Sequence, residues 1–195
     1  MNERPGKVDG KAGLTDQSDQ TLMEQVRAGD LRKLAVLFER HHKPLFHFFL
    51  RQNADRGGSE DLTQEVFFRI LRYRHTYDPA HTFSSWMYQI ARNVKRDHDY
   101  KRRGEAPPVV DTASDAPGID AEINKSQEAQ LIRRALEQLP EDKREVLILS
   151  RYQNLKYDEI ARILGVEVNT VKVRVYRAVR ALGEIYSELA GEKLA

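Results

Sequence analysis

Apolar residues recur every three or four positions along most of the chain, which is the spacing of one helical face. The pattern begins near Ser18, which is suited to cap a first helix that carries Leu22 and Val26 four residues apart. A second helix is expected after Asp30, which is suited to cap it, with apolar residues at helical spacing as far as Phe49. No segment shows the alternation of polar and apolar residues that is typical of strands, so the pattern predicts an all-α fold.

Two more helices are expected before residue 105. A Gly-Gly pair at 57–58 breaks the chain, and Ser59 is placed to cap the third helix. The fourth helix is expected to begin at about Thr82 and to end in a basic run at Gly104. Together these helices predict a first domain over residues 18–104.

The chain changes character after residue 104. Residues 105–120 contain three prolines, four acidic residues and no Lys or Arg, so a flexible acidic linker is expected there. Helical spacing resumes with Leu131 and Ala135 and predicts a second small domain over 121–190. Residues 1–17 have almost nothing to bury and are expected to form a disordered N-terminal tail. The predicted architecture is two small helical domains joined by a flexible acidic linker.

Residues 157–182 have the pattern of a helix-turn-helix motif. Ala161 is small where two helices would cross, and Gly165 can supply the positive φ of the turn. The second helix is expected to bury a row of valines that includes Val175 and Val179, while its outward positions hold four cations and no acid. Such a helix can enter the major groove of DNA, where Arg reads guanine and Asn pairs with adenine. An ordinary solvated face on a helical hairpin is the alternative.

The composition excludes several classes of function. The 195 residues are 32% charged and 40% hydrophobic with a net charge of +2, which suits small helical domains and excludes a wholesale polycation. The absence of cysteine excludes disulfides, thiolate metal sites and nucleophilic thiols. The first residues lack the apolar core of a signal peptide, and no apolar run is long enough to span a membrane. A cytoplasmic protein is therefore expected.

Residues 83–103 interleave aromatic residues with six cations. Single-stranded nucleic acid is held by stacking of its bases on aromatic rings and by cations that follow its backbone, and this segment offers both. Phe83 and Trp86 are explained equally well as core residues. The segment's best-placed polar contacts are Tyr88, Asn93, Lys95 and Arg96.

Four motifs in this order make the chain resemble the extracytoplasmic-function (ECF) sigma factors, the smallest sigma subunits of bacterial RNA polymerase. Residues 60–67 (EDLTQEVF) and 83–93 (FSSWMYQIARN) resemble sigma regions 2.2 to 2.4. Residues 139–147 (LPEDKREVL) and the helix-turn-helix resemble region 4. The resemblance implies a non-catalytic specificity subunit that directs core polymerase to promoters and opens the DNA strands at the minus-ten element.

The resemblance also implies three sets of contact residues. Binding to the clamp helices of the polymerase β′ subunit is implied for Asp61, Gln64 and Glu65. Recognition and opening of the minus-ten element are implied for Trp86, Tyr88, Arg92, Asn93, Lys95 and Arg96. Recognition of the minus-thirty-five element is implied for Asn169, Thr170, Lys172, Arg174, Tyr176 and Arg177. Val173 and Asn169 stand where the family often carries Ser and Gly.

The partners implied by the resemblance are core RNA polymerase, through its β′ clamp helices and β flap, promoter DNA, and a separate anti-sigma factor. The resemblance implies no cofactor, no metal and no small-molecule substrate. A stand-alone dimeric helix-turn-helix regulator is the main alternative, but it leaves residues 60–67 and the basic aromatic helix without a role. An enzyme would have to use Glu39-x-x-His42, and the chain lacks the second such motif that a di-iron site needs.

Overall fold

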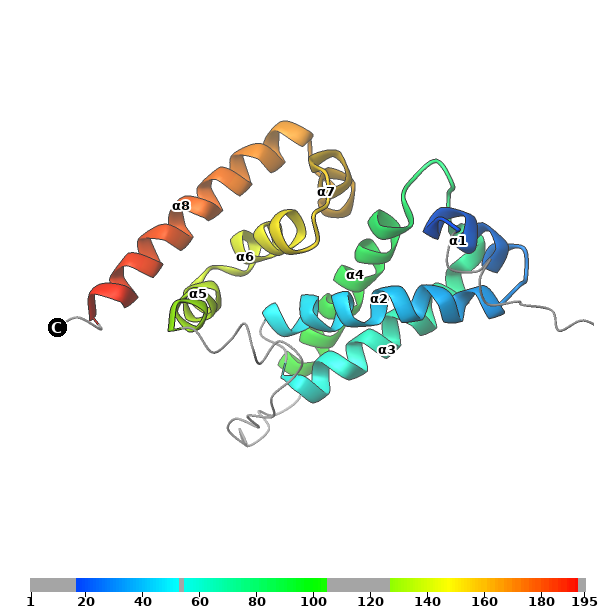
Figure 1. The fold of residues 1–195 in the computed structure, drawn as a ribbon, viewed down its shortest axis with the longest axis horizontal. Helices are drawn as coiled ribbons and strands as arrows, with labels where there is room; N and C mark the ends of the chain where they lie inside the picture. Colours follow the sequence, from blue (N-terminus) through cyan, green and yellow to red (C-terminus); the bar gives the residue numbers. More distant parts are fainter. Residues whose placement is uncertain (1–16, 53–54, 105–126, 193–195) are drawn as a thin grey trace, which may run out of the picture.

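The computed structural model describes residues 17–52, 55–104 and 127–192 of the chain (Figure 1). Within these ranges the regular structure is entirely helical, which confirms the all-α prediction. The predicted linker at 105–120 lies outside the described residues, as does the predicted tail except for Gln17.

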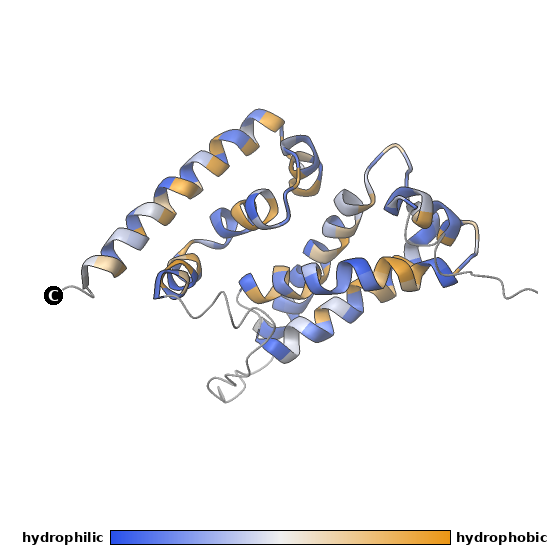
Figure 2. Cartoon of the chain, viewed as in Figure 1, coloured by the Kyte–Doolittle hydropathy of each residue, from blue (hydrophilic) through white to orange (hydrophobic). Residues whose placement is uncertain are grey.

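The first domain contains four α-helices and one short 3-10 helix. They are α1 (Asp19–Arg27), α2 (Arg32–Arg51), α3 (Arg56–Tyr73), η1 (Arg74–Thr76) and α4 (Phe83–Gly104). Helix α2 packs on α1 and α3, and α3 packs on α4. Apolar positions follow one side of these helices, as expected for amphipathic helices around a shared core (Figure 2). The core includes the fully buried Phe48, Phe49 and Phe83.

One of the three predicted caps is confirmed, and two are wrong. The Ser18 side chain accepts a hydrogen bond from the backbone N–H of Thr21 at 3.1 Å, as an N-cap does. Asp55, not Ser59, caps α3, so the Gly-Gly pair lies in its first turn. Asp30 does not cap α2, because its carboxylate is bound by the side chain of Arg32 at 2.9 Å.

The second domain contains four α-helices and a π-helical turn. They are α5 (Gln127–Gln138), α6 (Glu141–Leu147), η4 (Ile148–Tyr152), α7 (Tyr157–Leu164) and α8 (Val168–Glu192). Gly165 has φ +67°, as the helix-turn-helix pattern predicts for the residue between α7 and α8. The Glu159 side chain stabilises the start of α7 by accepting a hydrogen bond from the backbone N–H of Lys156 at 2.8 Å.

One predicted core residue of α8 is exposed. Val171 and Val175 are buried as expected, but Val179 is 44% exposed and Ala178 is fully buried instead. The buried positions 171, 175 and 178 are separated by four and then three residues, a spacing that keeps them on one face of the helix. Residue 179 lies 100° further around the helix axis than residue 178 and so falls outside that face. The valine row therefore turns out of the core at its end.

The two domains contact each other directly. Helix α7 lies against α4, while α5 and η4 lie against α2 (Figure 1). Two of the predicted nucleic-acid contacts on α4, Tyr88 and Arg92, therefore meet the second domain.

Candidate nucleic-acid interface

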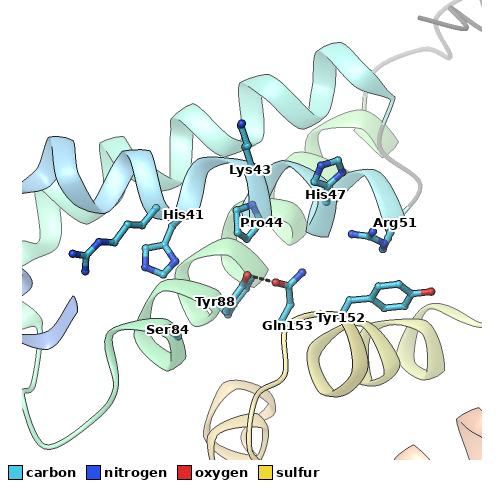
Figure 3. A pocket seen from close by; sticks show the side chains of 10 residues that line it. His41, Lys43, Pro44, His47, Arg51, Ser84, Tyr88, Tyr152 and Gln153 are labelled. Atoms are coloured by element: carbon cyan, nitrogen blue, oxygen red, sulfur yellow. Dashed lines mark hydrogen bonds between the residues drawn. The ribbon is translucent and has the colours of Figure 1, made fainter. Parts of the chain in front are cut away.

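Tyr88 takes part in the contact between the domains. Its ring packs against Phe48 at 5.1 Å, and its hydroxyl donates to Oε1 of Gln153 in the second domain at 2.5 Å (Figure 3). Only 3% of the residue is exposed. Burial raises the pKa of the Tyr88 hydroxyl, so this group is a neutral hydrogen-bond donor at physiological pH.

Two more residues of the α4 segment are bound by carboxylates of the second domain. Nε of Arg92 donates to both oxygens of Glu145, at 3.1 and 3.3 Å. The hydroxyl of Thr82 donates to Glu159. Burial raises the pKa of Glu145, and the charge of Arg92 opposes that shift. Acceptors of the second domain therefore occupy side-chain donors of the α4 segment that a nucleic acid would otherwise have to bind.

The other residues of the predicted minus-ten set are covered to different degrees. Trp86 is half-buried and its ring lies 5.3 Å from that of Tyr77, so it is a boundary residue of the core. Asn93 is half-buried, and Lys95 is paired with Asp99 at 2.5 Å. Arg96 is the one exposed residue of the set. The structure brings these residues to one helix but leaves little of their surface open.

The predicted minus-thirty-five set has the opposite character. Thr170 is half-buried, and the other five members are exposed on the outer face of α8. Tyr176 is 64% exposed. None of Lys172, Arg174 and Arg177 forms an ion pair with another described residue. This face can therefore meet an anion without first losing an internal partner.

The predicted polymerase-binding set lies on α3. Asp61 and Gln64 are exposed, while Glu65 is held by Arg69 at 2.7 Å. Arg69 also binds Asp97 of α4 at 2.8 Å, so Glu65 belongs to a network that joins the two helices. Phe68 is 58% exposed on this helix and is not among the polymerase contacts predicted from the sequence. The signal for it was an aromatic residue outside the buried stripe of α3.

The candidate di-iron residues form no metal centre. Nδ1 of His42 lies 2.9 Å from the backbone oxygen of Phe38, and the two rings stack at 4.9 Å. Glu39 is exposed. Across the described ranges, no group of three or more His, Cys, Asp or Glu side chains is arranged to hold a metal ion. In the same ranges, no helix has the length and apolar character needed to span a membrane.

Comparisons with protein families match both parts of the chain. The model described as Sigma-70 region 2 matches residues 37–105, and the model described as Sigma-70, region 4 matches residues 129–182. Helices α2 to α4 carry most of the first match, and α5 to α8 carry the second.

Curated relatives match over nearly their whole length. The RNA polymerase sigma-H factor of Pseudomonas aeruginosa is 30% identical over 92% of this chain and 99% of its own. The ECF RNA polymerase sigma-E factor of Escherichia coli is 30% identical over 85% of this chain and 92% of its own.

Two solved structures share the fold. CnrH in complex with the cytosolic domain of CnrY superposes with a TM-score of 0.68 and 22% identity, over 88% of this chain and 99% of that one. The sigma factor RpoE of Bartonella quintana, in complex with the anti-sigma factor NepR, gives a TM-score of 0.66 and 22% identity over 78% and 96%.

Proposed function

The chain belongs to the ECF-type sigma factors of RNA polymerase, and we propose that it reads its promoters with two surfaces that differ in accessibility. The observation that carries this function is the match of regions 2 and 4, in that order, to the two helical domains. A stand-alone dimeric regulator is not favoured, because it gives no role to the region 2 match. The protein acts as a polymerase subunit in the cytoplasm and has no catalytic chemistry of its own.

The outer face of α8 reads the minus-thirty-five element. Arg174 and Arg177 are exposed, unpaired within the described ranges, and presented by a helix-turn-helix that suits the major groove. Asn169 lies in the first turn of the same helix, and this end of a recognition helix contacts base edges. The remaining contacts on this face are Thr170, Lys172 and Tyr176.

The exposed face of α3 binds the β′ clamp helices of core polymerase. Asp61 and Gln64 offer polar groups there, and Phe68 adds an exposed aromatic ring of the kind that anchors interfaces. The charge reversal Asp61→Lys should weaken association with core polymerase, and adding Phe68→Ala should weaken the association further. Fluorescence anisotropy of the labelled chain titrated with core polymerase measures both. If neither change alters the affinity, the docking surface lies elsewhere.

The polar face of α4 opens the minus-ten element and holds its unpaired bases. Tyr88 and Asn93 supply polar groups for base edges, Trp86 supplies a ring, and Arg92, Lys95 and Arg96 supply charge for the backbone. Because the second domain binds Tyr88 and Arg92, this function requires the domains to separate. The β flap is the proposed polymerase contact of the second domain in the separated arrangement.

An anti-sigma protein is a further proposed partner. Both superposed structures contain a second chain, named in one as the cytosolic domain of CnrY and in the other, a sigma factor complex, as the anti-sigma factor NepR. Such a partner would control when the separated arrangement is reached.

Transcription in vitro tests the proposed function. Core polymerase is supplied with a library of genomic fragments, with and without the purified chain, and the transcripts are sequenced. Transcripts that start only in its presence are expected, and aligning their upstream regions gives the promoter. A chain that binds no core polymerase and yields no such transcripts contradicts the proposal.

A further inference from the structure

We propose that Gln52 and Tyr100 form a second base-binding site for the separated DNA strand, three turns along α4 from Tyr88. The inference rests on the proposed function and adds two residues to it. Gln52 follows the last residue of α2, and Tyr100 lies near the C-terminal end of α4. Both residues line a cavity of about 530 Å³ between α2, α4 and α6.

The side-chain amide of Gln52 includes a buried donor that has no partner. Only 7% of the residue is exposed, and no described residue accepts a hydrogen bond from its Nε2. A buried donor that stays unpaired is destabilising, so a group that offers it an acceptor gains affinity. An amide carries a donor and an acceptor side by side, which is the arrangement that pairs with the edge of a base.

Tyr100 supplies an aromatic ring beside this amide. It is 81% exposed, more than any other large hydrophobic residue that the structure describes. The other seven residues that line the cavity are all charged. The uncharged part of the lining is therefore one amide and one ring, and these groups suit the edge and the face of an unpaired base.

The charges around the cavity favour a nucleic acid only after the domains separate. With the domains in contact, three cations of α4 face four carboxylates. Three of these carboxylates belong to α6 and leave with the second domain: Glu141, Asp142 and Glu145. The remaining one is Asp99, which is bound to Lys95 at 2.5 Å. The wall that α2 and α4 keep has three cations and one carboxylate, so it attracts a DNA strand.

The three cations connect this site to the surface that the proposed function assigns to the strand. They are Arg92, Lys95 and Arg96, and they lie between Tyr88 and Tyr100 along α4. The two tyrosines are twelve residues apart, which is a rise of roughly 18 Å. A DNA strand covers that length in about five nucleotide steps of 3.4 Å. A strand whose backbone follows the cations would thus bring one further base to Tyr100.

The test uses the full chain bound to core polymerase and a labelled single strand from a promoter that the transcription assay identifies. The strand spans the minus-ten element with about six nucleotides on each side, each position carries each of the four bases in turn, and anisotropy measures the affinity. The parent should prefer one base at the position held by Gln52 by roughly fivefold or more. Gln52→Leu has a similar size but no polar atoms, so it should reduce this preference below about twofold and leave the other positions unchanged. The matched control is Gln25→Leu on α1, because Gln25 also has a buried amide atom without a partner but lies outside the cavity.

The ring is tested at the same position of the strand. Tyr100→Ala should weaken binding roughly 5- to 150-fold whichever base is present there, whereas Tyr100→Phe keeps the ring and should bind as the parent does. An abasic nucleotide at this position should weaken binding by the parent to a similar extent. It should cause no further loss with Tyr100→Ala, because the stacking is already absent.

Three results would overturn the base site. The first is a Gln52→Leu variant whose base preferences equal those of the parent at every position. The second is an equal loss of affinity for all four bases, which would place Gln52 on the strand backbone. The third is a lower unfolding midpoint for Gln52→Leu, which would show that the amide has a partner inside the chain. In each case transcription by the parent chain would leave the sigma function standing, and only its failure would contradict that function.

Discussion

The two surfaces proposed to read DNA are built from similar residues but present them in opposite states. On α8 the cations stand in solvent, and Arg174 and Arg177 have no ion-pair partner among the described residues. On α4 the corresponding groups are bound, with Tyr88 on Gln153 and Arg92 on Glu145. Under the proposed assignment, reading the minus-thirty-five element needs no rearrangement, whereas opening the minus-ten element requires the chain to exchange its own partners for DNA.

The physical basis of the difference is burial. A solvated cation costs little to keep unpaired, but a buried polar group must be hydrogen-bonded. The interface over α4 meets that requirement with polar contacts, and it is flanked by two cavities of about 500 and 530 Å³. Such an interface is specific in its contacts and bordered by open space, which suits the domain separation that the proposed function requires.

Locking the domains together should have the largest effect. The chain contains no cysteine, so Thr82→Cys with Glu159→Cys introduces one thiol on each side of a contact between α4 and α7. Joining the two with a short bis-maleimide should reduce promoter-dependent transcription at least about tenfold, because the competent population falls by that factor. Binding to a minus-thirty-five duplex should persist.

Each single-cysteine variant, treated with the same reagent, is the control. Full transcription by the linked chain would show that α4 needs no uncovering.

Charge reversal on α8 should have the next largest effect. Arg174→Glu or Arg177→Glu removes a cation and adds a repulsive charge, and a lost base contact costs about 1 to 3 kcal/mol. The affinity of the polymerase complex for a minus-thirty-five duplex should fall roughly 5- to 150-fold, measured by anisotropy. Arg133→Glu, on the exposed face of α5, is the matched control. Equal losses for the control and the α8 variants would mean that α8 contributes only general charge.

Removing one internal partner of α4 should have a smaller effect of opposite sign. Gln153→Ala leaves the buried hydroxyl of Tyr88 without its acceptor. This destabilises the closed arrangement, in which the second domain covers α4, by about 1 to 3 kcal/mol. The variant should bind single-stranded minus-ten DNA more tightly than the parent. Anisotropy with a labelled oligonucleotide measures this, with Gln138→Ala on the surface of α5 as control. A decrease would indicate that Gln153 itself contacts the strand.

The helix-turn-helix and the inventory of helices could be predicted because their signals are local. Gly165 marks a turn that needs a positive φ, and the spacing of Val171 and Val175 identifies the buried face of α8. The cap of α3 was misplaced because Asp55 and Ser59 are both good cap residues, and local preference alone does not choose between them.

The covering of α4 could not be predicted, because it depends on contacts between residues that are far apart in the sequence. Tyr88 and Gln153 are separated by 65 positions, and nothing in either segment marks the other as its partner. Glu145 lies in a motif that resembles region 4, and its pairing with Arg92 follows only from how the domains pack. The sequence identifies these residues of α4 as candidate contacts, but it does not show that the second domain buries and binds them.

The smallest expected effect concerns the titration of Glu145, and it tests what burial costs the closed arrangement. Burial raises the pKa of this carboxyl group above its ordinary value of about 4.3, although Arg92 opposes the shift. Below that ordinary value Glu145 is protonated in both the folded and the unfolded chain, so Glu145→Gln should hardly change the unfolding midpoint at pH 4. As the pH rises from the ordinary pKa towards the raised one, the unfolded chain ionises Glu145 while the folded chain keeps it protonated, so the parent loses stability relative to the variant. Thermal unfolding of both chains from pH 4 to 7 should therefore show a midpoint difference that grows in favour of the variant and then levels off. A difference that grows in favour of the parent would mean that attraction by Arg92 outweighs the cost of burial. The Arg92–Glu145 pair would then hold the domains together too strongly for the proposed uncovering of α4.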